Sequence, residues 1–117
     1  MVDKTRKKRL GELLKQELAN ILLRHSEQPL FVQITITTVE VSADLAVAKV
    51  FFSVFDDSKI AEATETLKRA AGFLRKSLAR KLNLRMTPRL YFSYDDSIIR
   101  GQKIAELIDA ANSTEVE

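Results

Sequence analysis

The chain has 117 residues, and 45% of them are hydrophobic, which is enough for one domain with a core but not for two. It contains no cysteine and a single histidine, which excludes disulfides, thiolate chemistry and multi-histidine metal sites and fits a cytoplasmic location. The net charge of +3 is unevenly distributed, because residues 1–9 carry +4, residues 66–94 carry +8 and the rest carry −9. A basic pole on an otherwise acidic chain indicates a surface for a polyanion. No apolar run approaches the roughly 20 residues of a membrane span, and the basic first residues contain no signal-peptide pattern.

Residues 4–24 form the first predicted element. Leu10, Leu14, Leu18 and Ile21 recur at a spacing of three or four residues, which predicts an amphipathic helix with one buried stripe. Pro29 ends this element, because the residue before a proline is disfavoured in a helix.

Two strands follow the first helix. Residues 30–42 alternate apolar and polar side chains, but the phase shifts near residues 37–38, which predicts a bulge there. Residues 45–55 again alternate, with alanine, valine and phenylalanine on one face. The short connection between the two strands predicts an antiparallel hairpin.

The second half of the chain adds a long helical stretch at residues 56–84, a third strand at residues 89–94 and a turn with a short closing helix. We expect an α+β fold of order α-β-β-α-α-β, in which helices cover one face of a three-stranded sheet. Residues 1–111 form one domain in this interpretation, and residues 112–117 are a frayed tail.

Gly72 lies in the middle of the long helical stretch, where glycine costs about 1 kcal/mol relative to alanine. Its place on the basic side of the helix predicts a close approach of nucleic acid to the backbone. We also expect a kink at Gly72, because a second helix starting there would present free N–H groups to anions. In one straight helix Lys81 would fall on the apolar side and Phe73 at its edge, and a kink would rotate both away. Flanking cations would add salt-dependent affinity for phosphates. The candidate RNA-binding residues are Lys68, Arg69, Ala70, Ala71, Gly72, Arg75, Lys76, Arg80, Lys81, Arg85 and Arg89.

The basic residues near the start of the chain are possible secondary RNA contacts. They would lie either in a disordered arm or in the first turns of the first helix, and both alternatives remain open. These residues are Lys4, Arg6, Lys7, Lys8 and Arg9.

Two similar segments, "VFDDSKI" and "SYDDSII", each place two aspartates and a serine between a strand and a helix. Paired carboxylates could hold Mg²⁺ in a nuclease, with Asp56, Asp57, Asp95 and Asp96 as ligands. Helix capping is the simpler interpretation, because aspartate and serine accept hydrogen bonds from the first N–H groups of a helix. We therefore expect no catalytic residue, no metal and no cofactor.

The histidine and the strand aromatic residues, which could also contribute to a functional site, have structural interpretations. His25 follows the first helix, and we expect it to interact with the C-terminal end of the helix dipole. Phe51, Phe55, Tyr91 and Tyr94 could stack RNA bases. A small domain needs aromatic residues in its core, however, so we expect these four to pack there.

Nearly the whole chain, from "RKKRLGELLKQELANIL" to "YDDSIIRGQKIAELI", resembles the ribosome-binding factor A family, and "RAAGFLRKSLARKLNLRMTPRLYFSYDDS" is the most specific segment. The resemblance implies a type II KH-like fold. In place of the G-x-x-G loop of ordinary KH domains, the family has an Ala-x-Gly motif that kinks one helix into the next. That motif corresponds here to Ala70, Ala71 and Gly72.

The resemblance also implies a function. Members of the family bind the immature small ribosomal subunit and its ribosomal RNA and support processing of the 5′ end of that RNA. They do so without catalysing cleavage, they are associated with cold adaptation, and an assembly GTPase can help their release. We expect a monomer. Two alternatives remain: the Mg²⁺-dependent nuclease described above, and a protein–protein adaptor that presents the basic face to an acidic partner.

Overall fold

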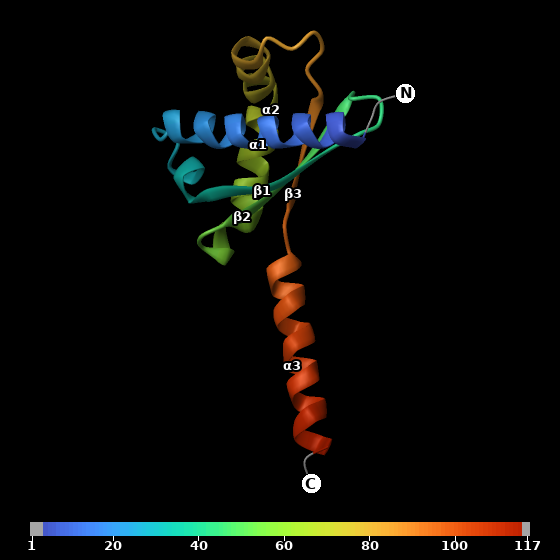
Figure 1. Ribbon diagram of the computed structural model, residues 1–117. Helices are drawn as coiled ribbons and strands as arrows, with labels where there is room; N and C mark the ends of the chain where they lie inside the picture. The colour runs from blue at the N-terminus through green and yellow to red at the C-terminus, as the bar shows by residue number, and fades with distance from the viewer. Residues whose placement is uncertain (1–3, 116–117) are drawn as a thin grey trace.

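The computed structural model describes residues 4–115 and contains an α+β fold built on one three-stranded sheet (Figure 1). The elements in chain order are α1 (Lys4–Arg24), η1 (Pro29–Gln33), β1 (Ile34–Val41), β2 (Val47–Val54), η2 (Asp57–Lys59), α2 (Ile60–Leu82), β3 (Arg89–Tyr94) and α3 (Ser97–Glu115). Here η marks a short 3-10 helix. The order confirms the predicted α+β arrangement, with one helix where two were expected in the middle of the chain.

The strands lie in the order β1-β2-β3. β1 and β2 are antiparallel, and their register shifts between Ile36 and Thr38, which confirms the predicted bulge. β2 and β3 are parallel, and α2 forms the crossover between them. The first part of the expected strand is instead η1, because Pro29 begins a 3-10 turn and the side chain of Gln28 accepts a hydrogen bond from Leu30 N at 3.3 Å.

The core lies on one face of the sheet, beneath α1 and α2. Alternate residues of β2 point into it, and Ala48, Val50 and Phe52 are fully buried. The helices contribute the fully buried side chains of Leu14, Leu18, Ile21, Leu67, Leu74 and Leu78. Burying a leucine side chain contributes about 1.5–3 kcal/mol, so these six positions hold both helices firmly on the sheet.

The expected kink at Gly72 does not break the helix. α2 is one helix of 23 residues, and no glycine in the described residues has a positive φ. Leu67, Leu74 and Leu78 lie on both sides of Gly72 and are buried against the same sheet. A continuous helix keeps all three in the core, and their burial outweighs the cost of about 1 kcal/mol for one helical glycine. The helix therefore presents no extra N–H groups at Gly72.

The closing helix is longer than expected. α3 has 19 residues and continues through residues 112–115, which belong to the segment predicted to fray. It extends away from the sheet and the other helices (Figure 1), and its described side chains from Lys103 to Ala111 are exposed. Within the described part of the chain, no helix has both the length and the apolar character needed to cross a membrane.

Candidate nucleic-acid interface

Basic residues from two segments that are far apart in the sequence lie at the same end of the sheet. The strand pairing places the end of β1, the start of β2 and the start of β3 together, because Val41 pairs with Ala48 and Val47 pairs with Arg89. The first residues of α1 lie at this same end, where Lys4, Lys7 and Lys8 line a hollow with Val39, Glu40 and Val41. The N-terminal basic residues from Lys4 onward are helical, which excludes the disordered arm for this part of the chain.

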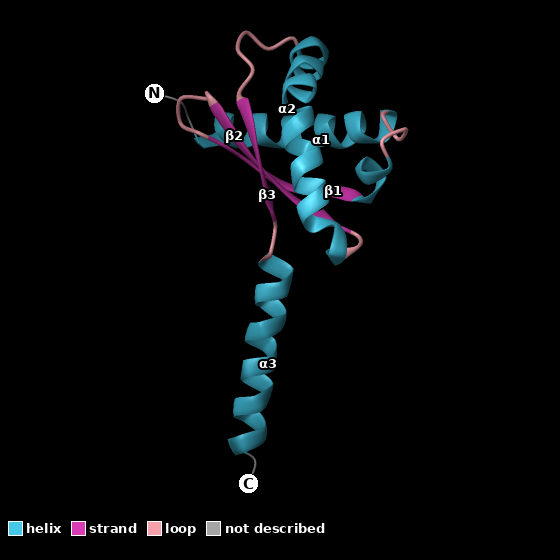
Figure 2. Ribbon diagram, turned by 180° about the vertical axis from the view of Figure 1, so that it is seen from behind, coloured by secondary structure: helices cyan, strands magenta, loops and turns pink. Residues whose placement is uncertain are grey.

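A groove runs between α2 and the segment that leads into β3, and we call it the α2–β3 groove. One hollow of this groove is lined by Ala71, Gly72, Arg75, Arg89, Leu90 and Tyr91. A second hollow is lined by Arg75, Lys76, Ala79, Arg85, Met86 and Thr87. The two hollows share Arg75, and Figure 2 shows α2 beside the strands, with the loop into β3 at its C-terminal end.

Gly72 leaves the backbone of α2 bare within this groove. The residue is exposed, and a Cβ atom built there would meet no atom within 4 Å. Packing therefore does not require glycine at this position. Gly11 is different, because a Cβ atom there would lie 2.7 Å from the carbonyl oxygen of Val39. No local pattern in the sequence marks Gly11, because its role depends on how closely α1 approaches β1.

Arg75 has a structural contact that the sequence did not predict. Its Nε and Nη2 atoms donate hydrogen bonds to the carbonyl oxygen of Thr87 at 3.1 and 2.8 Å. The guanidinium thus connects α2 to the chain just before β3. Its positive charge remains in the groove, between Lys76 on α2 and Arg89 on β3.

The other predicted residues of α2 lie outside the lining of the groove. Lys68, Arg80 and Lys81 are exposed. Arg69 and Ala70 line a separate hollow with Gln28, Phe31 and Thr66, on the flank of α2 that faces η1. Arg69 Nε also lies 4.0 Å from Glu65 Oε1. The structure therefore brings together Ala71, Gly72, Arg75, Lys76, Arg85 and Arg89 from the predicted set.

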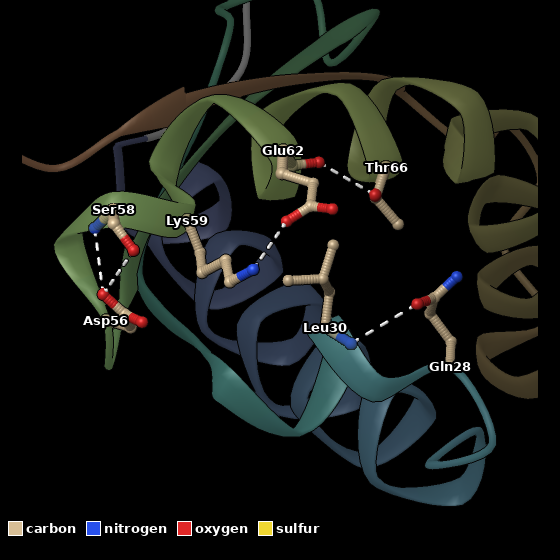
Figure 3. A network of polar contacts seen from close by, with 7 residues as sticks. All are labelled: Gln28, Leu30, Asp56, Ser58, Lys59, Glu62 and Thr66. Carbon is tan, nitrogen blue, oxygen red and sulfur yellow. Dashed lines mark hydrogen bonds and ion pairs between the residues drawn. The ribbon is translucent and has the colours of Figure 1, made fainter.

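The aspartate segments form caps. Asp56 Oδ1 accepts hydrogen bonds from the N–H and the hydroxyl of Ser58 at 3.0 and 2.8 Å (Figure 3). The hydroxyl contact and then the N–H contact lower the pKa of Asp56 below its ordinary value of 3.8. Asp95 Oδ1 accepts from Ser97 N at 3.0 Å, and its Oδ2 accepts from the Thr37 hydroxyl at 2.6 Å. In the portion of the chain described, no group of three or more His, Cys, Asp or Glu side chains could hold a metal ion.

His25 lies directly after the last residue of α1. Its N–H donates to the carbonyl oxygen of Ile21 at 3.1 Å, and its Nδ1 lies 3.0 Å from Glu27 Oε1. The ring meets Phe73 edge to face, with 4.9 Å between the centroids. These contacts fit the expected structural role at the end of the first helix.

The expected core packing of the four aromatic residues is wrong for three of them. Phe55 is 93% exposed and Tyr91 is 53% exposed, whereas Phe51 is half-buried. Tyr94 does pack against the core and meets Phe52 edge to face. Side chains alternate along a strand, so the burial of Phe52 and Phe92 turns Phe51 and Tyr91 to the other face. That alternation was readable in the sequence.

Comparisons with known proteins agree with these features. The family model described as "Ribosome-binding factor A" matches residues 6–108. A ribosome-binding factor A of Thioalkalivibrio sulfidiphilus is 44% identical over 110 residues, which cover 93% of this chain and 85% of that protein. A ribosome-binding factor A of Halothermothrix orenii is 42% identical over 115 residues, which cover 97% of this chain and 94% of that protein.

Solved structures show the same fold. The crystal structure of ribosome-binding factor A from Thermus thermophilus matches with a TM-score of 0.67 and 32% identity, covering 75% of this chain and 94% of that one. A Thermus thermophilus ribosome-binding factor A model, fitted into a cryo-EM map of a 30S complex, matches with a TM-score of 0.65 and 30% identity, covering 78% and 97%. The KH-like α+β fold, the family model and the relatives agree, and the chain belongs to the ribosome-binding factor A family.

Proposed function

We propose that the protein is an assembly factor that binds the immature small ribosomal subunit and its ribosomal RNA through the α2–β3 groove. Family membership supports this proposal, as does the similarity to a protein fitted into a map of a 30S complex. The protein acts as a monomer in the cytoplasm, where an assembly GTPase helps its release.

The observation that carries the proposal is the bare backbone at Gly72 among cations. An exposed helical glycine that no internal contact requires has a stability cost without a packing benefit. In the groove it allows a phosphate or ribose to reach the helix backbone. Arg75, Lys76 and Arg89 surround this position and would neutralise the phosphates.

The protein supports late maturation without cutting RNA. It holds an RNA element in a position that precedes the final one, while nucleases process the 5′ end. The hydrogen bonds of Asp56 and Asp95 favour this non-catalytic role over the nuclease, because both carboxylates are engaged as caps. Such a role would matter most in the cold, where an RNA escapes slowly from misfolded states, and this fits cold adaptation.

Co-sedimentation with purified small subunits tests the proposal. Immature and mature subunits are incubated with the protein at several salt concentrations. We expect binding that favours the immature particle and weakens steeply with salt. Lys76→Ala should weaken binding several-fold, whereas Lys103→Ala on α3 removes the same charge far from the groove and should not.

Two results would contradict the proposal. Binding to neither particle at any salt concentration would leave the family similarity as evidence of the fold alone. Binding that survives complete digestion of the RNA would favour the adaptor, because a contact with a protein does not depend on intact RNA.

A further inference from the structure

We infer that Tyr91, on the open face of the sheet, stacks against an unpaired base of the RNA whose backbone lies in the α2–β3 groove. This inference rests on the proposed function and adds a base contact to the phosphate contacts of the groove. It concerns the face of the sheet that α1 and α2 do not cover.

Tyr91 lies on the open face of the sheet and also lines the α2–β3 groove. It lines the groove with Gly72 and Arg89, and its side chain is 53% exposed although β3 is paired along β2. Its neighbours on β3, Leu90 and Phe92, are buried beneath the helices. An RNA strand that passes Gly72 therefore meets this ring next, without a gap in the interface.

The surroundings of Tyr91 suit a nucleotide. Lys49 pairs with Tyr91 across the two strands, and its Nζ lies 5.1 Å from the centre of the Phe51 ring on the same face. Lys49 can reach a phosphate beside a base that is stacked on Tyr91, with Arg89 on the groove side. Glu40 pairs with Lys49 from β1 and is the acidic residue next to this pair. The charges thus favour an RNA path that stays on the β2–β3 side of the sheet.

An RNA ligand explains these features better than a protein partner. On this face the exposed ring has Lys49, Arg89 and Ser93 as neighbours, and the apolar side chains beside it, Val47 and Phe51 on β2, are half-buried. Aromatic rings on a sheet surface stack bases in other RNA-binding folds, and every base offers a face for stacking. A protein partner would need a wider apolar contact at this site.

Tyrosine fluorescence tests the inference directly. The chain has no tryptophan and two tyrosines, so its emission reports on Tyr91 and Tyr94. The probe is an oligoadenylate of about ten nucleotides, which fits the site sizes of single-strand binders. We expect the oligoadenylate to quench the tyrosine emission of the wild type. In Tyr91→Phe the ring can still stack, but the remaining emission comes from Tyr94, so we expect no quenching.

Affinity gives the second measurement. Tyr91→Ala should weaken binding of the oligoadenylate by about 5-fold to 100-fold, and Tyr91→Phe by about 2-fold or less, since stacking needs the ring and not the hydroxyl. The salt dependence should stay the same in both variants, because the cations that bind phosphates are unchanged. Urea unfolding checks that both variants keep the wild-type fold.

Different results overturn the inference and the proposed function. Salt-sensitive binding of immature subunits with no quenching by oligoadenylate, or with equal affinity for wild type and Tyr91→Ala, overturns the stacking alone. If Tyr91→Ala weakens subunit binding while oligoadenylate does not quench the wild type, the ring docks on a ribosomal protein and the inference is wrong. Failure of the wild type to bind immature subunits contradicts the proposed function instead.

Discussion

The guanidinium of Arg75 donates two hydrogen bonds to the carbonyl oxygen of Thr87, from Nε at 3.1 Å and from Nη2 at 2.8 Å. This contact joins α2 to the residue that precedes Pro88 and β3. Both partners line the α2–β3 groove, so the contact holds the two sides of the groove together. Arg75 is therefore a positioning residue as well as a charge.

Arg75→Lys separates these two roles. Lysine keeps the charge but cannot donate both hydrogen bonds from a planar fork. We expect a loss of about 1 kcal/mol in the free energy of unfolding. We also expect faster amide hydrogen exchange in residues 83–88. Arg85→Lys is the matched control, because Arg85 lines the same hollow while the bonds to the Thr87 carbonyl come from Arg75. Equal stability and exchange in Arg75→Lys and wild type would show that the contact does not hold the loop.

Gly72→Ala should change stability and binding in opposite directions. Alanine gains about 0.5–1 kcal/mol of helix stability, and its Cβ atom meets no neighbour. The same methyl group narrows the approach to the backbone, so affinity for immature subunits should fall several-fold. Gly72→Glu should weaken binding further, because it adds bulk and negative charge. Urea unfolding and co-sedimentation measure the two effects, and a destabilised Gly72→Ala would make this glycine structural.

Gly11→Ala is expected to destabilise the protein by about 1–3 kcal/mol. The added Cβ atom would lie 2.7 Å from the Val39 carbonyl oxygen, so α1 or β1 must move. Equilibrium unfolding in urea measures the loss. No change in the unfolding midpoint would show that the contact relaxes without cost.

The lysines at the start of α1 should add to the salt dependence of binding. Lys4, Lys7 and Lys8 lie at the same end of the sheet as Arg89. If they contact the same RNA, replacing Lys7 and Lys8 by alanine should lower the slope of log affinity against log salt by about 0.7 for each phosphate that is no longer neutralised. Lys103→Ala is the control. An unchanged slope in the double variant would confine the RNA contact to the α2–β3 groove.

Asp56 makes stability depend on pH in the acid range. Its pKa is lowered from 3.8 in the folded chain by the hydrogen bonds from Ser58, so its stabilising effect is complete above the unfolded pKa. That effect is lost as the pH falls through the folded value. We expect Asp56→Asn to melt at a lower temperature than wild type at neutral pH, and the difference to disappear in strong acid. Asp57→Asn, which removes the neighbouring charge, is the control for thermal unfolding. A difference that persists in acid would contradict the role of the ionised carboxylate.

Elements with a local physical cause could be predicted from the sequence. The periodicity of residues 4–24 predicted α1, and residues 89–94 were predicted to form β3, both at the bounds that the structure has. The phase shift at residues 37–38 predicted the bulge, and the Asp–Ser pairs predicted the caps at Asp56 and Asp95. In each case neighbouring residues supply the full physical reason: one buried face, or a side chain that reaches the next N–H groups.

Which cations share a groove depends on how the elements pack against one another. Arg69 and Arg75 both lie on α2, but Arg69 lines a hollow beside η1, whereas Arg75 lines a hollow beside β3. The predicted kink is wrong because the buried leucines on both sides of Gly72 keep the helix continuous. α3 is longer than predicted, and its described side chains from residue 103 to residue 111 are exposed. The Arg75–Thr87 contact and the close approach at Gly11 depend on distances between elements that are remote in the chain. Local patterns do not encode those distances, because they are set by how the helices and strands pack together.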